Sequence, residues 1–310
     1  MEELLRQGVV VGIVATGVRL AAPFLFAALG EMFSQRSGVY NLGVEGIMML
    51  GAFSGFLVTW TTGSALLGTI FSVAIGVLMG LLMALVSVTL RAEQGISGIG
   101  MYLLGWGLSG LLFRRYVGFI TGVKGFASWH VPVVSDVPVL GPVLFQHNWM
   151  VYAALLLVPV SAFVLYQTTW GLKVKAVGMT PEAADSLGVN VNVIRYQCVV
   201  LGSALAGLAG AALTLGQANM YADNITAGRG FIAVALVYFA RWNPWGVLAG
   251  SLLFSTVSAF QLWVQVLGIR FPYEFVVILP YVMTIAALAM VSRRVWAPAA
   301  LGKPFRRGAY

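Results

Sequence analysis

The chain has 310 residues, of which 60% are hydrophobic and only 9% are charged. Because a soluble domain of this size carries about 25% charged residues, this chain has too little polar surface for water and must have lipid as its solvent. The net charge of +8 is scattered over loops and the C-terminal tail, which indicates membrane topology and disfavours a nucleic acid partner.

The apolar residues form nine segments, at roughly 9–29, 42–60, 64–90, 98–113, 149–167, 197–215, 230–240, 245–267 and 275–291. A helix needs about 20 residues to cross a bilayer, so segment 230–240 is short for a full span. Segment 42–60 has Asn41, Glu45 and several glycines near its start. Both segments therefore predict broken or irregular helices, which a membrane tolerates only where protein or a cavity surrounds the backbone.

These segments predict an all-α integral membrane protein. The expected fold is a polytopic helical bundle of about 8–10 transmembrane segments, with a broken helix near residues 37–53. We expect a single transmembrane domain over residues 1–310, with a polar loop at 168–196 and a cytoplasmic tail at 292–310.

The basic residues predict the orientation, since Lys and Arg gather on the cytoplasmic side. Placing the tail after Ser292 in the cytoplasm and alternating sides puts eleven Lys and Arg inside and six outside, with Arg19 within a span. Nine full spans put the N-terminus outside, whereas a segment 42–60 that re-enters without crossing puts it inside. The second topology moves Arg6 to the inner side and Arg36 to the outer side. The number of basic residues on each side is unchanged, so the charge count leaves both topologies open.

A cluster of polar residues lies at the start of the second segment, in the sequence GEMFSQRSGVYNLGVEG. Such residues cost free energy in lipid unless they are paired or hydrated. Asn41 and Glu45 are four residues apart and share a face if the backbone there is helical. One interpretation places both residues, with Gly46, on a translocation pathway. The other is a buried ion pair of Glu45 with Arg36 or Arg19 that locks the bundle, and both interpretations stay open.

Motifs for chemistry of its own are missing from the chain. None of its four lysines lies in the phosphate-binding pattern G-x-x-x-x-G-K-[ST], so we expect no ATP hydrolysis by this chain. Both histidines, His130 and His147, fall in the outer loop 114–148, whose prolines predict an ordered lid or short helix. That position disfavours a hydrolase or metalloprotease. The single Cys198 excludes an internal disulfide and a thiolate metal cluster.

The polar loop 168–196 lies between long apolar segments and is basic at both ends. Its basic residues are Lys173, Lys175 and Arg195. A structured, basic loop between membrane spans indicates a docking site for another protein.

A short helix is predicted within this loop. Thr180 is a candidate N-cap and Pro181 suits the first turn. Glu182 and Asp185 lie near the positive end of the helix, and Gly188 ends it. The helix has about two turns, and its apolar face is too modest for deep insertion into lipid. That face consists of Ala183, Ala184 and Leu187.

Three polar residues, Asp223, Asn224 and Arg229, precede segment 230–240 on the outer side of this topology. They either gate the outer vestibule or form a surface ion pair and a helix N-cap. The sequence RWNP at 241–244 predicts a tight turn, because proline cannot continue the preceding helix.

These residues also carry a family resemblance. The second-span signature of bacterial ABC importer permeases of the branched-chain amino acid/ribose class resembles residues 37–53, SGVYNLGVEGIMMLGAF. Their cytoplasmic coupling loop is similar to residues 171–196, in which EAADSLG fits the pattern EAA-x-x-x-G. Their C-terminal signatures resemble residues 228–254 and 279–290. The similarity runs in order from about residue 20 to 291 and looks closest to the nucleoside and simple-sugar branch.

The resemblance implies a transport subunit that is not itself an enzyme. Such a permease pairs with a second permease subunit, homologous or identical, and a partner ABC ATP-binding subunit holds ATP and Mg. This chain then binds no cofactor or metal of its own. An extracytoplasmic substrate-binding protein, often a lipoprotein, delivers a nucleoside or related simple-sugar solute. ATP hydrolysis switches the permease between outward- and inward-facing states. The implied location is the bacterial cytoplasmic (inner) membrane, with the C-terminus cytoplasmic.

Carried onto this sequence, the resemblance assigns roles to particular residues. The substrate pathway lies around Asn41, Glu45, Gly46 and Arg229 and in segments 98–113 and 228–240. Arg114-Arg115 departs from the expected pattern, because it lies on the outer side against the charge rule. The residues that couple the permease to the ATPase are Lys175, Gly178, Pro181, Glu182, Ala183, Ala184, Asp185 and Gly188.

The alternative is a secondary transporter driven by an ion gradient. It predicts titratable residues near the midplane and inverted repeats. Glu45 is essentially the one acid in mid-span, and no convincing repeat relates the two halves.

Overall fold

The computed structural model describes residues 7–129, 135, 137, 139–267 and 297–307, together with residues 278, 282, 285 and 289. Within these residues every regular element is a helix. In chain order the helices are α1 (Gln7–Arg36), α2 (Val44–Thr62), α3 (Ala65–Ala84), α4 (Gln94–Tyr116), α5 (Trp149–Gln167), α6 (Thr169–Met179), α7 (Pro181–Ser186), α8 (Val191–Leu213), α9 (Arg229–Phe239) and α10 (Pro244–Val266). Short π-helical stretches lie at Leu85–Thr89 (η2), Gly141–Phe145 (η3) and Thr214–Ala218 (η4).

Seven of the described helices are long and apolar enough to cross a membrane, namely α1, α2, α3, α4, α5, α8 and α10. The predicted all-α polytopic bundle is therefore confirmed. Segment 230–240 forms the short helix α9 of 11 residues, as its length predicted. The ninth apolar segment, 275–291, lies almost entirely outside the described residues.

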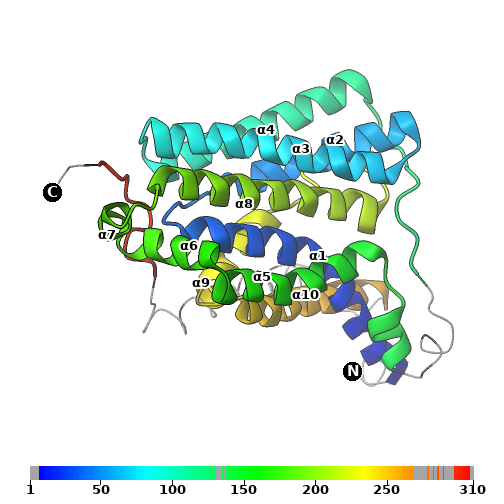
Figure 1. Ribbon diagram of the computed structural model, residues 1–310. Coiled ribbons are helices and arrows are strands. Elements are labelled where there is room, and N and C mark those ends of the chain that lie inside the picture. The colour runs from blue at the N-terminus through cyan, green and yellow to red at the C-terminus, as the bar shows by residue number, and fades with distance from the viewer. Residues whose placement is uncertain are drawn as a thin grey trace.

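Helix α8 runs through the middle of the bundle (Figure 1), with α2, α3 and α4 on one side and α1, α5, α9 and α10 on the other. It packs against α1, α2 and α3. The most apolar stretches of α2 and α8 are 78% and 72% buried inside the protein, against 33–39% for the other spans. These two helices form the interior together with the second half of α1, in which every residue from 21 to 35 is buried.

Glycines allow this close packing at the helix crossings. A Cβ atom on Gly51 of α2 would lie 2.8 Å from the Cα of Gly207 in α8, and one on Gly80 of α3 would lie 2.7 Å from the Cβ of Ser203. Only a residue without a side chain lets two helix backbones approach so closely. Gly51 and Gly80 thus lie at the crossings of α2 and α3 with α8.

Two irregular segments, 37–43 and 219–228, interrupt the bundle, and the second of them bonds to Glu45 in the first turn of α2. The expected break is confined to 37–43, and α2 is regular from Val44 onward. Asn41 lies outside the helix, so the condition for Asn41 and Glu45 to share one helical face is not met. The reason is local, because the side chain of Asn41 accepts a hydrogen bond from the amide of Gly43 at 2.9 Å and closes a turn that competes with helix.

The stretch 168–196, predicted as a loop, is mostly helical. The hydroxyl of Thr168 caps α6 by accepting from the amide of Gly171, and Asn190 caps α8 in the same way. Between them α7 begins at Pro181 as expected, and it ends before Gly188, whose φ of 83° lies in the left-handed region. Thr180 takes the N-cap position as predicted, although its side chain makes no capping hydrogen bond.

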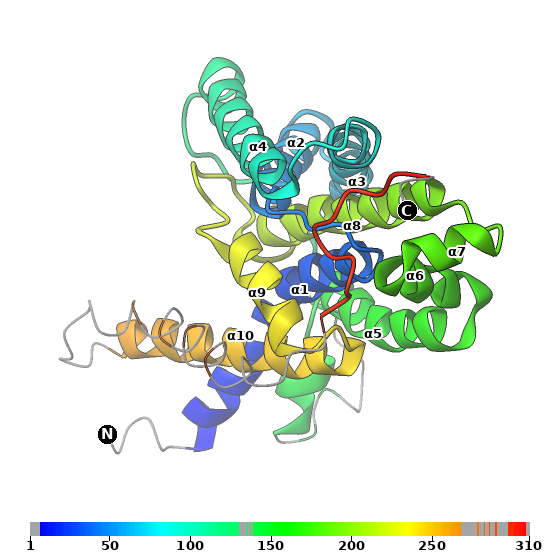
Figure 2. The ribbon, with the colours of Figure 1, turned by 90° about the vertical axis from the view of Figure 1, so that its left-hand side faces the viewer.

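Helices α6 and α7 and the C-terminal segment 297–307 lie at one end of the bundle (Figures 1 and 2), and α1 begins at the opposite end. We call the first of these the α7 end. Seen from that end, the C-terminal segment crosses in front of α8 and α1 (Figure 2).

Candidate functional site

The N-terminus of α9 is held by a carboxylate from another helix. Gly228 precedes α9 with a φ of 81° and offers no side-chain cap. One oxygen of Glu45, in the first turn of α2, accepts from the amide of Gly228 at 2.8 Å and from the hydroxyl of Thr226 at 2.6 Å. Its other oxygen accepts from the amide of Gly230 at 2.5 Å. A buried negative charge therefore stabilises the positive end of α9 and joins that helix to α2.

Glu45 makes no ion pair with Arg36 or Arg19, so that interpretation was wrong. The Arg36 guanidinium instead donates to the carbonyl oxygen of Trp242 from Nε at 3.0 Å and from Nη2 at 2.6 Å. Arg19 is exposed. The two residues lie at different depths in the bundle. Arg36 is the last residue of α1, at the α7 end, whereas Glu45 follows after the chain has turned back into the bundle.

A chain of buried hydrogen bonds links the turn after α9 to the start of α2. The indole of Trp242 donates to Gln35 at 2.9 Å, and the amide of Gln35 donates to Glu31 at 2.9 Å. The same oxygen of Glu31 accepts from the backbone amide of Asn41 at 3.1 Å. Asn41 in turn orients Gly43, the residue before α2. Because every link is buried, one hydrogen-bond network holds both the turn and the start of α2 in place.

The turn itself is strained. Arg241 and Trp242 both have positive φ angles, of 52° and 54°, a conformation that costs about 1–3 kcal/mol for a residue other than glycine. The side chain of Trp242 is almost fully buried. The hydrogen bonds of its indole and carbonyl groups hold the strained conformation in place.

Gly46 and Gly230 lie at backbone contacts around Glu45. A Cβ atom on Gly46 would lie 2.6 Å from the Cα of Tyr102 in α4, and one on Gly230 would lie 2.5 Å from the Cα of Glu45. The structure therefore places Gly46 at the crossing of α2 and α4. The starts of α2 and α9 and the helix α4, all expected along the pathway, meet at this point.

The polar residues before α9 divide between two roles. Asp223 forms an exposed ion pair with Arg114 at 3.4 Å, as one sequence interpretation predicted. The Arg229 guanidinium donates to the carbonyl oxygens of Ile225 and Thr226 at 2.9 and 3.4 Å. No residue of this stretch supplies a side-chain cap for α9, so the expected local N-cap was wrong and Glu45 takes that role.

Aromatic residues that sequence analysis did not single out lie beside this point. Tyr102 and Trp106 stack in parallel along α4, with ring centroids 6.1 Å apart, and Phe231 of α9 meets Tyr102 edge-on at 5.1 Å. The spacing of four residues is the signal that predicts such a helical pair. Trp106 is 48% exposed on α4.

The residues expected to couple to a partner divide between inside and outside. Gly178, Pro181 and Ala184 are buried. Gly178 packs against the backbone of Arg36 at the end of α1. Burial keeps these three residues from touching another protein, and they instead fix α6 and α7 against the bundle.

The outer surface of α7 is small and well defined. Glu182 and Ala183 are exposed, and Leu187 is 84% exposed directly after the helix. The predicted apolar face is therefore split, since Ala184 packs inward against Val174 and Ile194. Glu182 and Leu187 thus place an acidic and an apolar side chain next to each other on the exposed surface of the α7 end.

The C-terminal segment straps α6, α7 and α8 together, which sequence analysis did not foresee. The amide of Ala300 donates to Gly178 at 2.9 Å, and the buried Arg195 donates to the carbonyl oxygen of Lys303 at 3.0 Å. Phe305 packs into the small core beneath α7. The only property of this segment that the sequence indicated was its positive charge.

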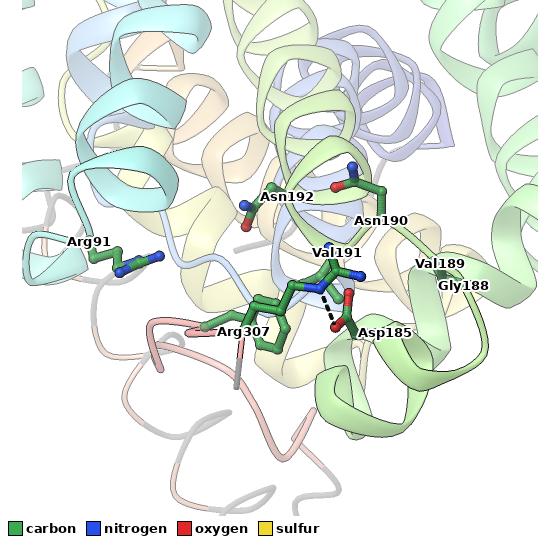
Figure 3. A pocket seen from close by; sticks show the side chains of 9 residues that line it. Arg91, Asp185, Gly188, Val189, Asn190, Val191, Asn192 and Arg307 are labelled. Carbon is green, nitrogen blue, oxygen red and sulfur yellow. Dashed lines mark hydrogen bonds and ion pairs between the residues drawn. The ribbon is translucent and has the colours of Figure 1, made fainter. Parts of the chain in front are cut away.

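A cavity of about 240 Å³ opens where this strap meets α7 (Figure 3). Asp185 accepts from Arg307 at 3.0 Å at its edge. Arg91 approaches from the connection between α3 and α4, opposite Arg307 (Figure 3). Asp185, expected among the coupling residues, thus binds the C-terminal segment.

Comparisons with known proteins show the family of the chain. The family model described as branched-chain amino acid transport system / permease component matches residues 13–288. The chain is 40% identical to the "Putative glucose ABC transporter permease protein TsgC13" of Haloferax volcanii, over 83% of this chain and 79% of that protein. It is 34% identical to the nucleoside ABC transporter permease protein NupC of Lactococcus lactis, over 94% and 95%. It is 33% identical to the guanosine ABC transporter permease protein NupQ of Bacillus subtilis, over 93% and 94%. No solved structure matches.

Proposed function

Because the chain belongs to the family of branched-chain amino acid transport system permease components, we propose that it is the membrane subunit of an ATP-driven importer for a nucleoside or a related simple sugar. The relatives named for nucleoside, guanosine and glucose transport support this solute class. Their names as ABC transporter permeases favour an ATP-driven role over the ion-gradient alternative.

The surface of α7 is the observation that carries the proposal. Glu182, Ala183 and Leu187 project from a short helix that buried residues fix to the bundle. A partner that moves such a helix also moves the elements packed beneath it. We assign the docking of the ATPase to this surface, which ends at Gly188, and the support of α7 to Gly178, Pro181, Ala184 and Asp185.

A path of contacts leads from α7 to the centre of the bundle. Gly178 of α6 packs on the backbone of Arg36, and Arg36 holds the carbonyl oxygen of Trp242. From Trp242 the buried hydrogen bonds run to Asn41 and the start of α2. Glu45 then joins α2 to α9. In this proposal Asn41 and Glu45 shape the pathway by holding these two helix starts.

The solute passes beside the exposed surface of α4 and α9. Tyr102 and Trp106 offer a flat aromatic surface on which a nucleobase or a sugar ring stacks. Arg229, the first residue of α9, contributes a positive charge on this side. Gly46 keeps α4 close enough to Glu45 for the aromatic pair to lie beside it.

The remaining assignments concern the assembly. A second permease subunit and an extracytoplasmic substrate-binding protein complete the transporter, and the partner ATPase binds ATP and Mg while this chain binds no cofactor. The eleven Lys and Arg on one side support a cytoplasmic C-terminus and α7 end in a cytoplasmic membrane.

A matched pair of leucine substitutions tests the docking surface. Leu187→Gln, in the co-purified transporter, is expected to weaken ATPase binding at least about tenfold, as truncation of a buried interface residue does. Glu182→Arg is expected to abolish stimulation of the ATPase while the chain stays folded. Leu172→Gln is the control, since Leu172 is 66% exposed on α6 but lies outside the docking surface. Equal effects of both leucine substitutions would contradict the assignment, and so would transport by the lone chain under an ion gradient.

A further inference from the structure

A second cavity at the α7 end is lined by three basic side chains. It has a volume of about 270 Å³ and lies between the end of α1, α6, the turn after α9 and the C-terminal segment. Arg36, Lys175 and Arg241 line it, together with Trp242 and Pro298. It is separate from the cavity of Figure 3, with which it shares no lining residue.

Within the described part of the chain, no carboxylate neutralises these three cations. Neither described ion pair includes Arg36, Lys175 or Arg241. Glu182 lies on the exposed side of α7 and does not line the cavity. The other described carboxylates accept hydrogen bonds elsewhere, and they are Glu31, Glu45, Glu93, Asp185 and Asp223.

The basic groups are held beside the cavity by the surrounding structure. The Lys175 ammonium lies 4.7 Å from the centre of the Tyr166 ring, and burial together with the charge of Arg36 lowers the pKa of Lys175. The Arg36 guanidinium is fixed on Trp242. Arg241 projects from a strained backbone. Three like charges therefore line one cavity, and a bound anion would favour their charged forms.

The cavity lies where membrane spans end. Arg36 is the last residue of α1, a candidate span, and Lys175 follows shortly after α5, another span. Arg241 lies in the turn that leads into α10, a third span. Residues at span ends lie at the depth of lipid headgroups.

We propose that this cavity binds a phosphate group, and that an anionic phospholipid headgroup supplies it. Guanidinium groups match phosphate oxygens with paired donors, and an ammonium adds a point charge. Basic pockets between helices on the cytoplasmic side suit such headgroups. The volume admits a phosphate with several waters, since a water takes up about 30 Å³ in the liquid.

The test uses the full chain in nanodiscs of phosphatidylcholine with or without phosphatidylglycerol, and native mass spectrometry counts the lipids retained. Lys175→Gln and Arg241→Gln are each expected to weaken retention of phosphatidylglycerol about fivefold, the effect of one cation near an anionic headgroup. Lys173→Gln is the matched control, because it removes the same charge from α6 while Lys173 does not line the cavity. Arg241→Lys keeps the charge and checks that the strained turn tolerates substitution.

Inorganic phosphate distinguishes the two sources of the phosphate group. If it binds the chain in phosphatidylcholine nanodiscs and depends on Lys175 while phosphatidylglycerol is not retained, the lipid assignment is overturned. Retention of phosphatidylglycerol that depends on Lys175 and Arg241 supports the lipid, whether or not free phosphate displaces it. Unchanged retention in both glutamine variants, or an equal loss in Lys173→Gln, would overturn the site altogether.

Discussion

Glu45 accepts three hydrogen bonds from residues about 180 positions later in the chain. All three donors lie at the start of α9, where a helix has unpaired amides and a partial positive charge. Since the Glu45 side chain is buried, nothing else compensates those amides if the carboxylate is lost. One residue of α2 thus determines where α9 begins.

Glu45→Gln is expected to destabilise the protein by at least about 2 kcal/mol, because an amide nitrogen replaces one accepting oxygen opposite a backbone N–H. Thermal unfolding in detergent measures this, with Thr226→Val as a milder comparison that removes one hydrogen bond and costs about 1 kcal/mol. If Glu45→Gln abolishes transport without a change in thermal stability, the carboxylate contacts the solute directly and the capping role is wrong.

At the scale of the helices, backbone contacts at glycines set the spacing around the centre. Gly105 of α4 packs directly on the backbone of Gly46, whereas the position of Gly107 on the same helix is open. The two glycines are two residues apart and point to different sides of α4. Substituting each of them by alanine therefore separates the effect of helix packing from the effect of the low helix propensity of glycine.

Gly105→Ala is expected to push α4 away from α2 and to cost about 1–3 kcal/mol, the usual effect of overpacking. Gly107→Ala is expected to be neutral or to stabilise α4 by up to about 1 kcal/mol, because alanine favours helix. Differential scanning fluorimetry of the two variants gives the comparison. Equal melting temperatures would contradict the helix crossing at Gly46.

At the scale of the whole molecule, the C-terminal segment closes the α7 end. Phe305 is 8% exposed and packs with Val174, Ala184 and Ile194. Residues more than one hundred positions apart in the chain thereby form one small core that supports the docking surface. The position of α7 depends on this segment as well as on its own sequence.

Phe305→Ala is expected to remove about 3–5 kcal/mol of local packing and to speed amide hydrogen exchange across residues 180–190. Stimulation of the ATPase is expected to fall although no docking residue changes. Lys303→Ala is the control, since the segment uses the carbonyl oxygen of Lys303 and its side chain is exposed. Unchanged exchange at α7 in Phe305→Ala would show that α7 does not depend on the strap.

The sequence predicted the helical class, eight of the segments and the bounds of α7, because hydropathy and the conformations of Pro181 and Gly188 are local properties. It also located Asn41 and Glu45 as unusual polar residues within an apolar chain. It did not predict their partners, because each partner is brought near only when distant helices pack.

By itself, then, the sequence determined that this protein is a polytopic membrane bundle with a short polar helix between two spans. The hydropathy of a segment and the backbone preferences of proline and glycine are local properties, which depend on only a few neighbouring residues. Tertiary structure alone decided that Glu45 caps α9, that Ala184 faces inward while Ala183 and Leu187 face outward, and that the tail straps α7. These depend on which helices lie side by side, and packing across the whole chain determines that arrangement.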